Sequence, residues 1–162
     1  MGAVRRSAWL LILAAFLAAQ QFPAITGQNL LGKDVNLPDA HPTVIVMGFT
    51  HASQTQTKPW TQRIGTQFPL YSIAVLEDVP RLVRGMAVHG IKSGVPEERR
   101  ARFLLVYHNE KQLKLAAGFS APDDAYLLVL DKSGAIRWKY HGPVTDQAFR
   151  EMQDHMAEAD AK

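Results

Sequence analysis

The sequence predicts one α/β domain with a central mixed sheet flanked by helices and a C-terminal β-hairpin and helix. Residues Thr43–Phe49 form an apolar, β-branched run without alternation, which is typical of a strand buried on both faces. A polar loop and a predicted helix start at Lys58-Pro59 follow, and strand-like and helix-like patterns then continue to alternate. The 162 residues contain no internal repeat and no linker, so one folded domain is expected over residues 21–162.

Residues 1–20 have the composition of a signal peptide or an N-terminal anchor. Arg5 and Arg6 precede an unbroken apolar stretch, Leu10–Ala19, which is short for a membrane span. Cleavage after Ala19 would leave Leu17 at a position where a small residue is preferred, so a cleaved signal and an uncleaved inner-membrane anchor both remain open. In either case we expect an exported protein of the periplasm or cell envelope, in contact with the membrane surface if the segment is retained.

The first half of the domain is expected to begin with an extended segment at Phe22–Thr26 and a hairpin or loop pair over Gln28–Pro38. The helix after the buried strand is predicted over Lys58–Phe68, with apolar residues at i, i+4 and i+8. Residues Tyr71–Leu76 predict a second buried strand, and the pair Glu77-Asp78 that follows it is expected in a turn.

The middle of the chain predicts a helix that begins near Pro80. Its apolar residues are available for the core: Leu82, Val83, Met86 and Val88. Gly90 and Gly94 are expected to open a loop, and Phe103–Tyr107 predicts a third buried strand. Asn109 is a plausible cap for a short helix that ends at Gly118.

The last part of the chain predicts a hairpin and a final helix. Strands are expected at Tyr126–Leu130 and Ala135–Tyr140, joined by a tight turn at Asp131–Gly134. Thr145 is expected to cap the final helix, in which apolar residues form one stripe: Phe149, Met152 and Met156. The pair Asp123-Asp124 is expected in a turn before the hairpin.

Composition excludes several classes of function. The chain contains no cysteine, which excludes disulfides and thiol chemistry of every kind. It carries 18 basic and 15 acidic side chains, and because two of the basic ones lie in residues 1–20, the domain itself is nearly neutral. Nucleic-acid binding is therefore not expected, since it needs a basic face.

Two stretches carry a family resemblance, and the element order is that of thioredoxin-like proteins. The segment Gly48–Gln56, GFTHASQTQ, resembles the G-F-T-H-C-x-x-x-C loop of thioredoxin-like copper chaperones for cytochrome oxidase. Ala52 and Gln56 stand where that family has its two cysteines. We refer to His51, Ala52 and Gln56 as the vestigial active-site loop.

Most of the remaining domain resembles the thioredoxin-like ATP synthase assembly factors and their bacterial relatives. The matching segments, in order, are Gly90–Arg100, Ala125–Asp131, Ser133–Trp138 and Gly142–Thr145. Redox-active thioredoxins also carry a cis-proline before the strand that enters the hairpin, and Ala125 stands at that position here. The resemblance therefore implies a thioredoxin-like fold whose redox site has lost both of its parts.

We expect a redox-dead, chaperone-like assembly factor with a protein partner, a subunit of a membrane complex, and with no catalytic residue and no cofactor. The alternatives are a thioredoxin- or peroxiredoxin-related oxidoreductase and a copper-chaperone-like metal binder that uses His51. The absence of cysteine argues against the oxidoreductase. The metal binder is disfavoured because His51 has no other metal ligand near it in the sequence.

The candidate partner-binding residues are three arginines of the predicted loop Gly90–Arg102 and two residues of the hairpin: Arg99, Arg100, Arg102, Arg137 and Trp138. The alternative for Trp138 is that its side chain packs under the final helix and is not available to a partner. We expect the loops Gly48–Thr57, Gly90–Arg102 and Ser120–Ala125 at one end of the sheet, where thioredoxin-like proteins bind peptides by strand addition.

Overall fold

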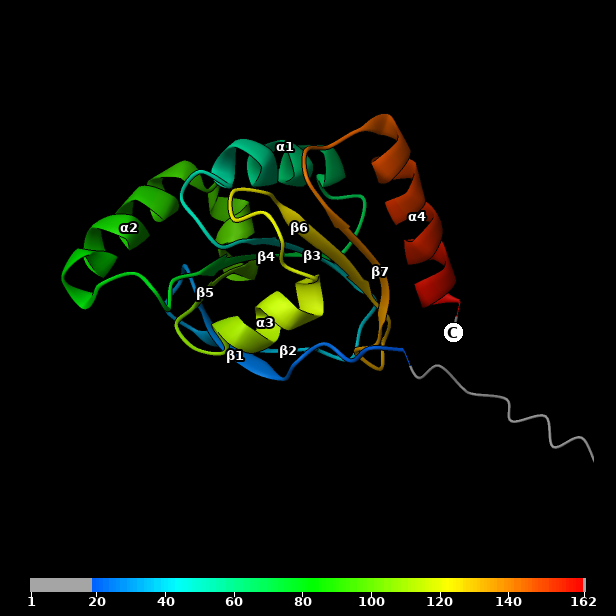
Figure 1. Ribbon diagram of the computed structural model, residues 1–162, viewed down its shortest axis with the longest axis horizontal. Helices are drawn as coiled ribbons and strands as arrows, with labels where there is room; N and C mark the ends of the chain where they lie inside the picture. The colour runs from blue at the N-terminus through cyan, green and yellow to red at the C-terminus, as the bar shows by residue number, and fades with distance from the viewer. Residues whose placement is uncertain (1–18, 162) are drawn as a thin grey trace, which may run out of the picture.

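The computed structural model describes residues 19–161, which form one seven-stranded sheet with helices on both faces (Figure 1). The strands are β1 (Ile25–Asn29), β2 (Asp34–Leu37), β3 (Thr43–Gly48), β4 (Leu70–Val75), β5 (Phe103–Val106), β6 (Tyr126–Leu130) and β7 (Ile136–His141). The helices are α1 (Gln54–Ile64), α2 (Arg81–Gly94), α3 (Glu110–Ala117), α4 (Asp146–Asp160) and the 3₁₀ helix η1 (Glu97–Arg102). The predicted α/β architecture, with its C-terminal hairpin and helix, is confirmed.

The sheet is mixed, with strand order β2-β1-β5-β4-β3-β6-β7. Strand β3 pairs in parallel with β4 and antiparallel with β6, and β4 pairs in parallel with β5. Residues Thr43 to Met47 are all buried, as the uninterrupted apolar run predicts for a central strand. The C-terminal end of β3 is therefore held on both sides where the vestigial active-site loop begins.

Each face of the sheet has its own core. On one face, α1 and α4 cover β3 and β6 with Trp60, Ile64 and Met152. On the other face, α3 packs Leu113 against the opposite side of the same strands, and Figure 1 shows α3 across the sheet from α1. Thr145 caps α4 as predicted, because its hydroxyl oxygen accepts the Ala148 N–H at 3.1 Å.

Helix α1 begins four residues earlier than predicted, at Gln54 instead of Lys58, and it ends at Ile64. The start lies upstream because the backbone already turns there, where Gln54 N–H donates to the carbonyl oxygen of His51 at 3.2 Å. Pro59 consequently lies inside the helix, near enough to its start that few backbone bonds are affected. The predicted inner face is correct for Trp60 and Ile64, both fully buried.

Helix α2 differs most from the prediction. It continues through Gly90 to Gly94, where a loop was expected, and none of its residues is buried. Of the apolar residues predicted for the core, Val88 is half-buried against the cluster of Leu30, Leu76 and Leu105. The other three are exposed, and Leu82 and Met86 most of all, at 97% and 77%. Figure 1 shows α2 at the left, set apart from the other helices.

The strand beneath α2 explains part of this difference. Strand β4 was predicted to be buried on both faces, but its residues alternate between buried and half-buried. The half-buried side carries the small residues Ser72 and Ala74, which give α2 little apolar surface to pack against. The sheet face next to α1 therefore stays partly open.

One predicted arrangement of loops is wrong. Gly48 ends β3, whereas Arg102 directly precedes β5, and β3, β4 and β5 run parallel. The segment Pro96–Arg102 therefore lies at the opposite end of the sheet from the loop that follows β3.

No helix among residues 19–161 is long and apolar enough to cross a bilayer. The predicted signal or anchor lies, except for its last two residues, outside the described part of the chain.

Candidate functional site

The loop after β3 turns back sharply on the strand. A Cβ atom on Gly48 would lie only 2.3 Å from the Ser53 hydroxyl oxygen, so any larger residue here would displace that hydroxyl. The buried Ser53 hydroxyl donates to the carbonyl oxygen of Thr50 at 2.7 Å. The Thr50 hydroxyl in turn donates to Asp123 Oδ1 at 2.7 Å. The loop is thereby tied to the turn that precedes β6, and the predicted proximity of these two segments is confirmed.

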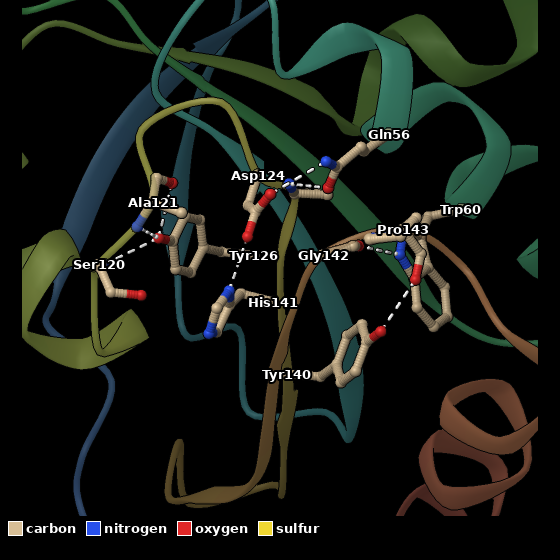
Figure 2. Close-up of polar contacts among 11 residues, drawn as sticks. Gln56, Trp60, Ser120, Ala121, Asp124, Tyr126, Tyr140, His141, Gly142 and Pro143 are labelled. Carbon is tan, nitrogen blue, oxygen red and sulfur yellow. Dashed lines mark hydrogen bonds and ion pairs between the residues drawn. The ribbon is translucent and has the colours of Figure 1, made fainter.

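Gln56, which the resemblance aligns with the second cysteine, bridges the loop to the start of β6 (Figure 2). Its Oε1 accepts the backbone N–H of Ala125 at 3.0 Å, and its Nε2 donates to Asp124 Oδ1 at 3.0 Å. We call these two contacts the Gln56 bridge. The amide of Gln56 thus satisfies one acceptor and one donor at the start of β6.

Asp124 extends the network to the last strand. His141 Nδ1 on β7 lies 2.8 Å from Asp124 Oδ2. The hydrogen bonds from His141 and, to a smaller degree, from Gln56 lower the pKa of Asp124 below its ordinary value. The carboxylate is therefore ionised at neutral pH, which suits a group that accepts hydrogen bonds from two sides.

The Tyr126 hydroxyl makes hydrogen bonds to the backbone of the turn before β6. It accepts the backbone N–H groups of Ser120 and Ala121, each at 2.9 Å, and donates to the carbonyl oxygen of Ala121 at 2.8 Å. The Tyr126 ring is fully buried and stacks on the His141 ring with centroids 5.5 Å apart. The turn is thus fixed by a buried side chain and keeps its shape without a ligand.

A second tether joins α1 to the end of the hairpin. Trp60 Nε1 donates to the carbonyl oxygen of Gly142 at 2.9 Å, and Tyr140 packs edge-on against the Trp60 ring. The Tyr140 hydroxyl donates to the carbonyl oxygen of Pro143 at 2.9 Å, as Figure 2 shows. The vestigial site is therefore braced from α1, β6 and β7 together.

This arrangement has the geometry of a closed structural site. The backbone N–H groups that would offer a strand-addition edge are already used: Ser120, Ala121, Asp124 and Ala125. No cysteine is present, so the chain cannot perform thiol–disulfide exchange with its own residues. Peptide binding by strand addition at this loop is not favoured.

His51 is exposed at the rim of the loop. Among residues 19–161, no group of three or more histidine, cysteine and acidic side chains converges on a point where a metal ion would bind.

The candidate partner-binding residues do not gather on one surface. Arg100 donates to the carbonyl oxygens of Lys92 and Val95 at the end of α2, and Arg102 lies over the Tyr71 ring at 5.3 Å. Arg99 lines a groove on the face of the sheet next to α1. The three arginines thus point to different places.

The two hairpin candidates have structural partners. Arg137 Nε donates to Asp131 Oδ2 at 2.6 Å at the start of the hairpin. Trp138 is half-buried and stacks on Tyr140 and on His155 of α4. Trp138 therefore packs under the final helix, which was the alternative to a partner-binding role.

Sequence reasoning missed Asp124, Tyr126 and His141 as site residues. Asp124 was interpreted as part of an acidic turn, which describes its place but not its contacts. Its closeness to Gln56 was available only as a consequence of the thioredoxin-like order, in which β6 lies beside β3. His141 lies one residue beyond the predicted end of the hairpin strand.

The structure also contains a groove between α1 and α2 with a cavity volume of about 620 Å³. It extends from the loop after β3, at His51, to Arg99 near the other end of the sheet. A cavity of this size is typical of binding sites in proteins.

Comparison with solved structures shows which fold the chain has. The fold is similar to BsSco, a member of the Sco family of cytochrome c oxidase assembly proteins, with a TM-score of 0.58, 12% identity, and coverage of 89% of this chain and 96% of that chain. It is also similar to a thio-disulfide isomerase from Thermus thermophilus, with a TM-score of 0.55, 18% identity, and coverage of 87% and 95%. The exposed lipoprotein thioredoxin Etrx1 from Streptococcus pneumoniae gives a TM-score of 0.56, 11% identity, and coverage of 82% and 99%.

The chain therefore has the thioredoxin-like fold, as the resemblance implied. The chain contains no cysteine, and Gln56 in the loop after β3 is hydrogen-bonded to the start of β6. No protein-family model matches the chain, and no curated protein matches it.

Proposed function

We propose that this protein is a non-catalytic assembly factor of the cell envelope, which binds a subunit of a membrane protein complex without covalent exchange. The Gln56 bridge carries the proposal. It replaces a reactive thiol by an amide that holds two segments together, and so preserves the shape of the site while removing its chemistry.

Two further observations support an assembly role. BsSco, one of the similar structures, is described as a member of a family of cytochrome c oxidase assembly proteins. Most of the domain resembles the ATP synthase assembly factors in segments that occur in the same order. The proposed client is therefore a subunit of ATP synthase, and the composition of residues 1–20 supports export to the periplasm or cell envelope.

The proposal is tested by deleting the gene and measuring assembled ATP synthase and cytochrome oxidase on native gels. We expect the level of assembled ATP synthase to fall and the full, cysteine-free chain to restore it. Unchanged levels of both complexes would contradict the assembly role. A fall in assembled cytochrome oxidase alone would support the assembly role but refute ATP synthase as the source of the client subunit.

An activity assay tests the non-catalytic part of the proposal. Purified protein should show only background activity in insulin reduction, because no thiol is available. Disulfide reduction above background by pure protein would refute the non-catalytic part of the proposal.

A further inference from the structure

The groove between α1 and α2 is open because α2 stands away from the sheet. Its walls include Val83, Met86 and Ile91 from α2, and its floor includes Ala74 of β4. Met86 extends the apolar surface of the groove toward solvent, because its side chain is 77% exposed. Large apolar side chains exposed beside an apolar groove indicate an interaction site.

Two glycines of α2 leave part of the groove without side chains. Gly90 and Gly94 both line the groove, one helical turn apart, and nothing lies within 4 Å of the position a Cβ would take on either. Glycine inside a helix costs about 1 kcal/mol relative to alanine. The helix therefore carries residues that destabilise it and that open space along the groove, which allows another backbone to approach closely.

The charges of the groove have one sign. Lys58 of α1 and Arg99 of η1 line it, and no acidic side chain does so. Among the described residues, neither of these two side chains is in an ion pair. An occupant with acidic groups beside an apolar face would complement both features.

We infer that the groove binds one amphipathic helix of a protein partner, with its small and apolar residues against Gly90 and Gly94 and its acidic residues toward Lys58 and Arg99. A helix in an apolar groove between two helices is a recurring mode of recognition. Methionine on the rim is suited to it, because its flexible side chain adapts to the partner. The inference rests on the proposed function and names the chemistry of the partner.

The test uses the full chain and a fluorescein-labelled peptide of about 15 residues, roughly the length of α2, with leucine and alanine on one face and glutamate on the other. We expect fluorescence anisotropy to show saturable binding. A peptide of the same design with lysine in place of glutamate should bind at least about tenfold more weakly. Equal binding of the two peptides, or no binding of the acidic one, would overturn the inference.

Variants at the glycines test the groove with changes that should not unfold the protein. Gly90→Ala should raise the melting temperature, because alanine favours the helix and meets no neighbour, yet it should weaken peptide binding at least about tenfold. The matched control is Gly85→Ala in the same helix, where a Cβ also meets nothing but where the residue does not line the groove. Gly85→Ala should raise the melting temperature and leave binding unchanged. If Gly90→Ala binds as tightly as the unmodified chain, the groove is not the docking site.

Other occupants give different results. Binding to phosphatidylglycerol vesicles that Gly90→Ala abolishes, without binding of the acidic peptide, would assign the groove to lipid and overturn the inference. A dimer in sedimentation that Gly90→Ala dissociates, again without peptide binding, would assign it to a second copy. Failure of the docking site and failure of the assembly role can be told apart. A full chain that restores complex levels but does not bind the acidic peptide would reject only the groove as the docking site.

Discussion

The side-chain oxygen of Gln56 accepts the backbone N–H of Ala125 at 3.0 Å, although the two residues are 69 positions apart in the sequence. This contact joins the two positions that the resemblance aligns with a cysteine and the cis-proline of redox-active thioredoxins. The same amide also donates to Asp124 Oδ1 at 3.0 Å, so one side chain of α1 makes two hydrogen bonds to the segment that leads into β6. The vestigial site is thus a structural joint between α1 and β6.

The Gln56 bridge predicts that Gln56→Glu destabilises the protein at neutral pH. The variant replaces an N–H donor by a carboxylate oxygen next to ionised Asp124, and we expect the free energy of unfolding to fall by about 1–3 kcal/mol. Acidification should reduce the loss, because protonation of either carboxylate removes the repulsion. Chemical denaturation at pH 7 and pH 5 measures both effects.

The control for this variant is Gln54→Glu, the same chemical change at an exposed position in the first turn of α1. An acidic side chain is favourable at a helix start, so this variant should be as stable as the unmodified chain or slightly more stable. Equal stability of the Gln56→Glu and unmodified chains at pH 7 would show that the bridge contributes nothing.

Restored cysteines should not restore an efficient catalyst. We expect the double variant Ala52→Cys, Gln56→Cys to show weak insulin reduction, because Ala125 replaces the cis-proline and the Gln56 bridge is lost. Its melting temperature should also fall, since the N–H of Ala125 and the carboxylate of Asp124 lose partners. Turnover comparable to that of a thioredoxin assayed in parallel would contradict this prediction.

Asp131 predicts a specific loss of stability in acid. Burial raises the pKa of this carboxyl, but hydrogen bonds from Ser133, from Arg137 and from the backbone of Ala135 outweigh it and lower the pKa to about 2. A pKa below the unfolded value means that the ionised form stabilises the fold. About 2 kcal/mol is therefore present above pH 4 and is lost as the pH falls from about 4 to about 2.

The variant Asp131→Asn isolates this contribution. We expect it to be less stable than the unmodified chain at pH 7 and the difference to shrink below pH 4. Asp160→Asn, at the exposed end of α4, should show no such difference. A difference for Asp131→Asn that stays constant from pH 7 to pH 2.5 would refute the role of ionisation.

The hairpin turn predicts a steric effect at Gly134. A Cβ there would lie 2.5 Å from Pro38 Cγ, and the residue has a φ of +78°. Gly134→Ala should therefore lower the free energy of unfolding by about 2–4 kcal/mol. Gly32→Ala is the matched control, because Gly32 has a φ of +80° but no atom within 4 Å of its Cβ position. The thermal denaturation of the two variants should differ clearly, and equal losses would show that backbone strain alone is responsible.

Much of the fold was predictable from local patterns. The uninterrupted apolar run of Thr43–Phe49 identified the central strand, and the turn at Asp131–Gly134 identified the hairpin, because both signals depend on neighbouring residues. The absence of cysteine excluded thiol chemistry without any structure. The order of the elements then indicated the thioredoxin-like fold.

Contacts between distant residues were decided only by the tertiary structure. An apolar pattern shows that a helix has an apolar face, but it does not show which surface covers that face. For this reason Leu82 and Met86 of α2 were assigned to the core, whereas the small residues of β4 leave them exposed. In the same way, the resemblance aligns Gln56 with a cysteine, but the hydrogen bonds of Gln56 exist only because the sheet places β6 beside β3.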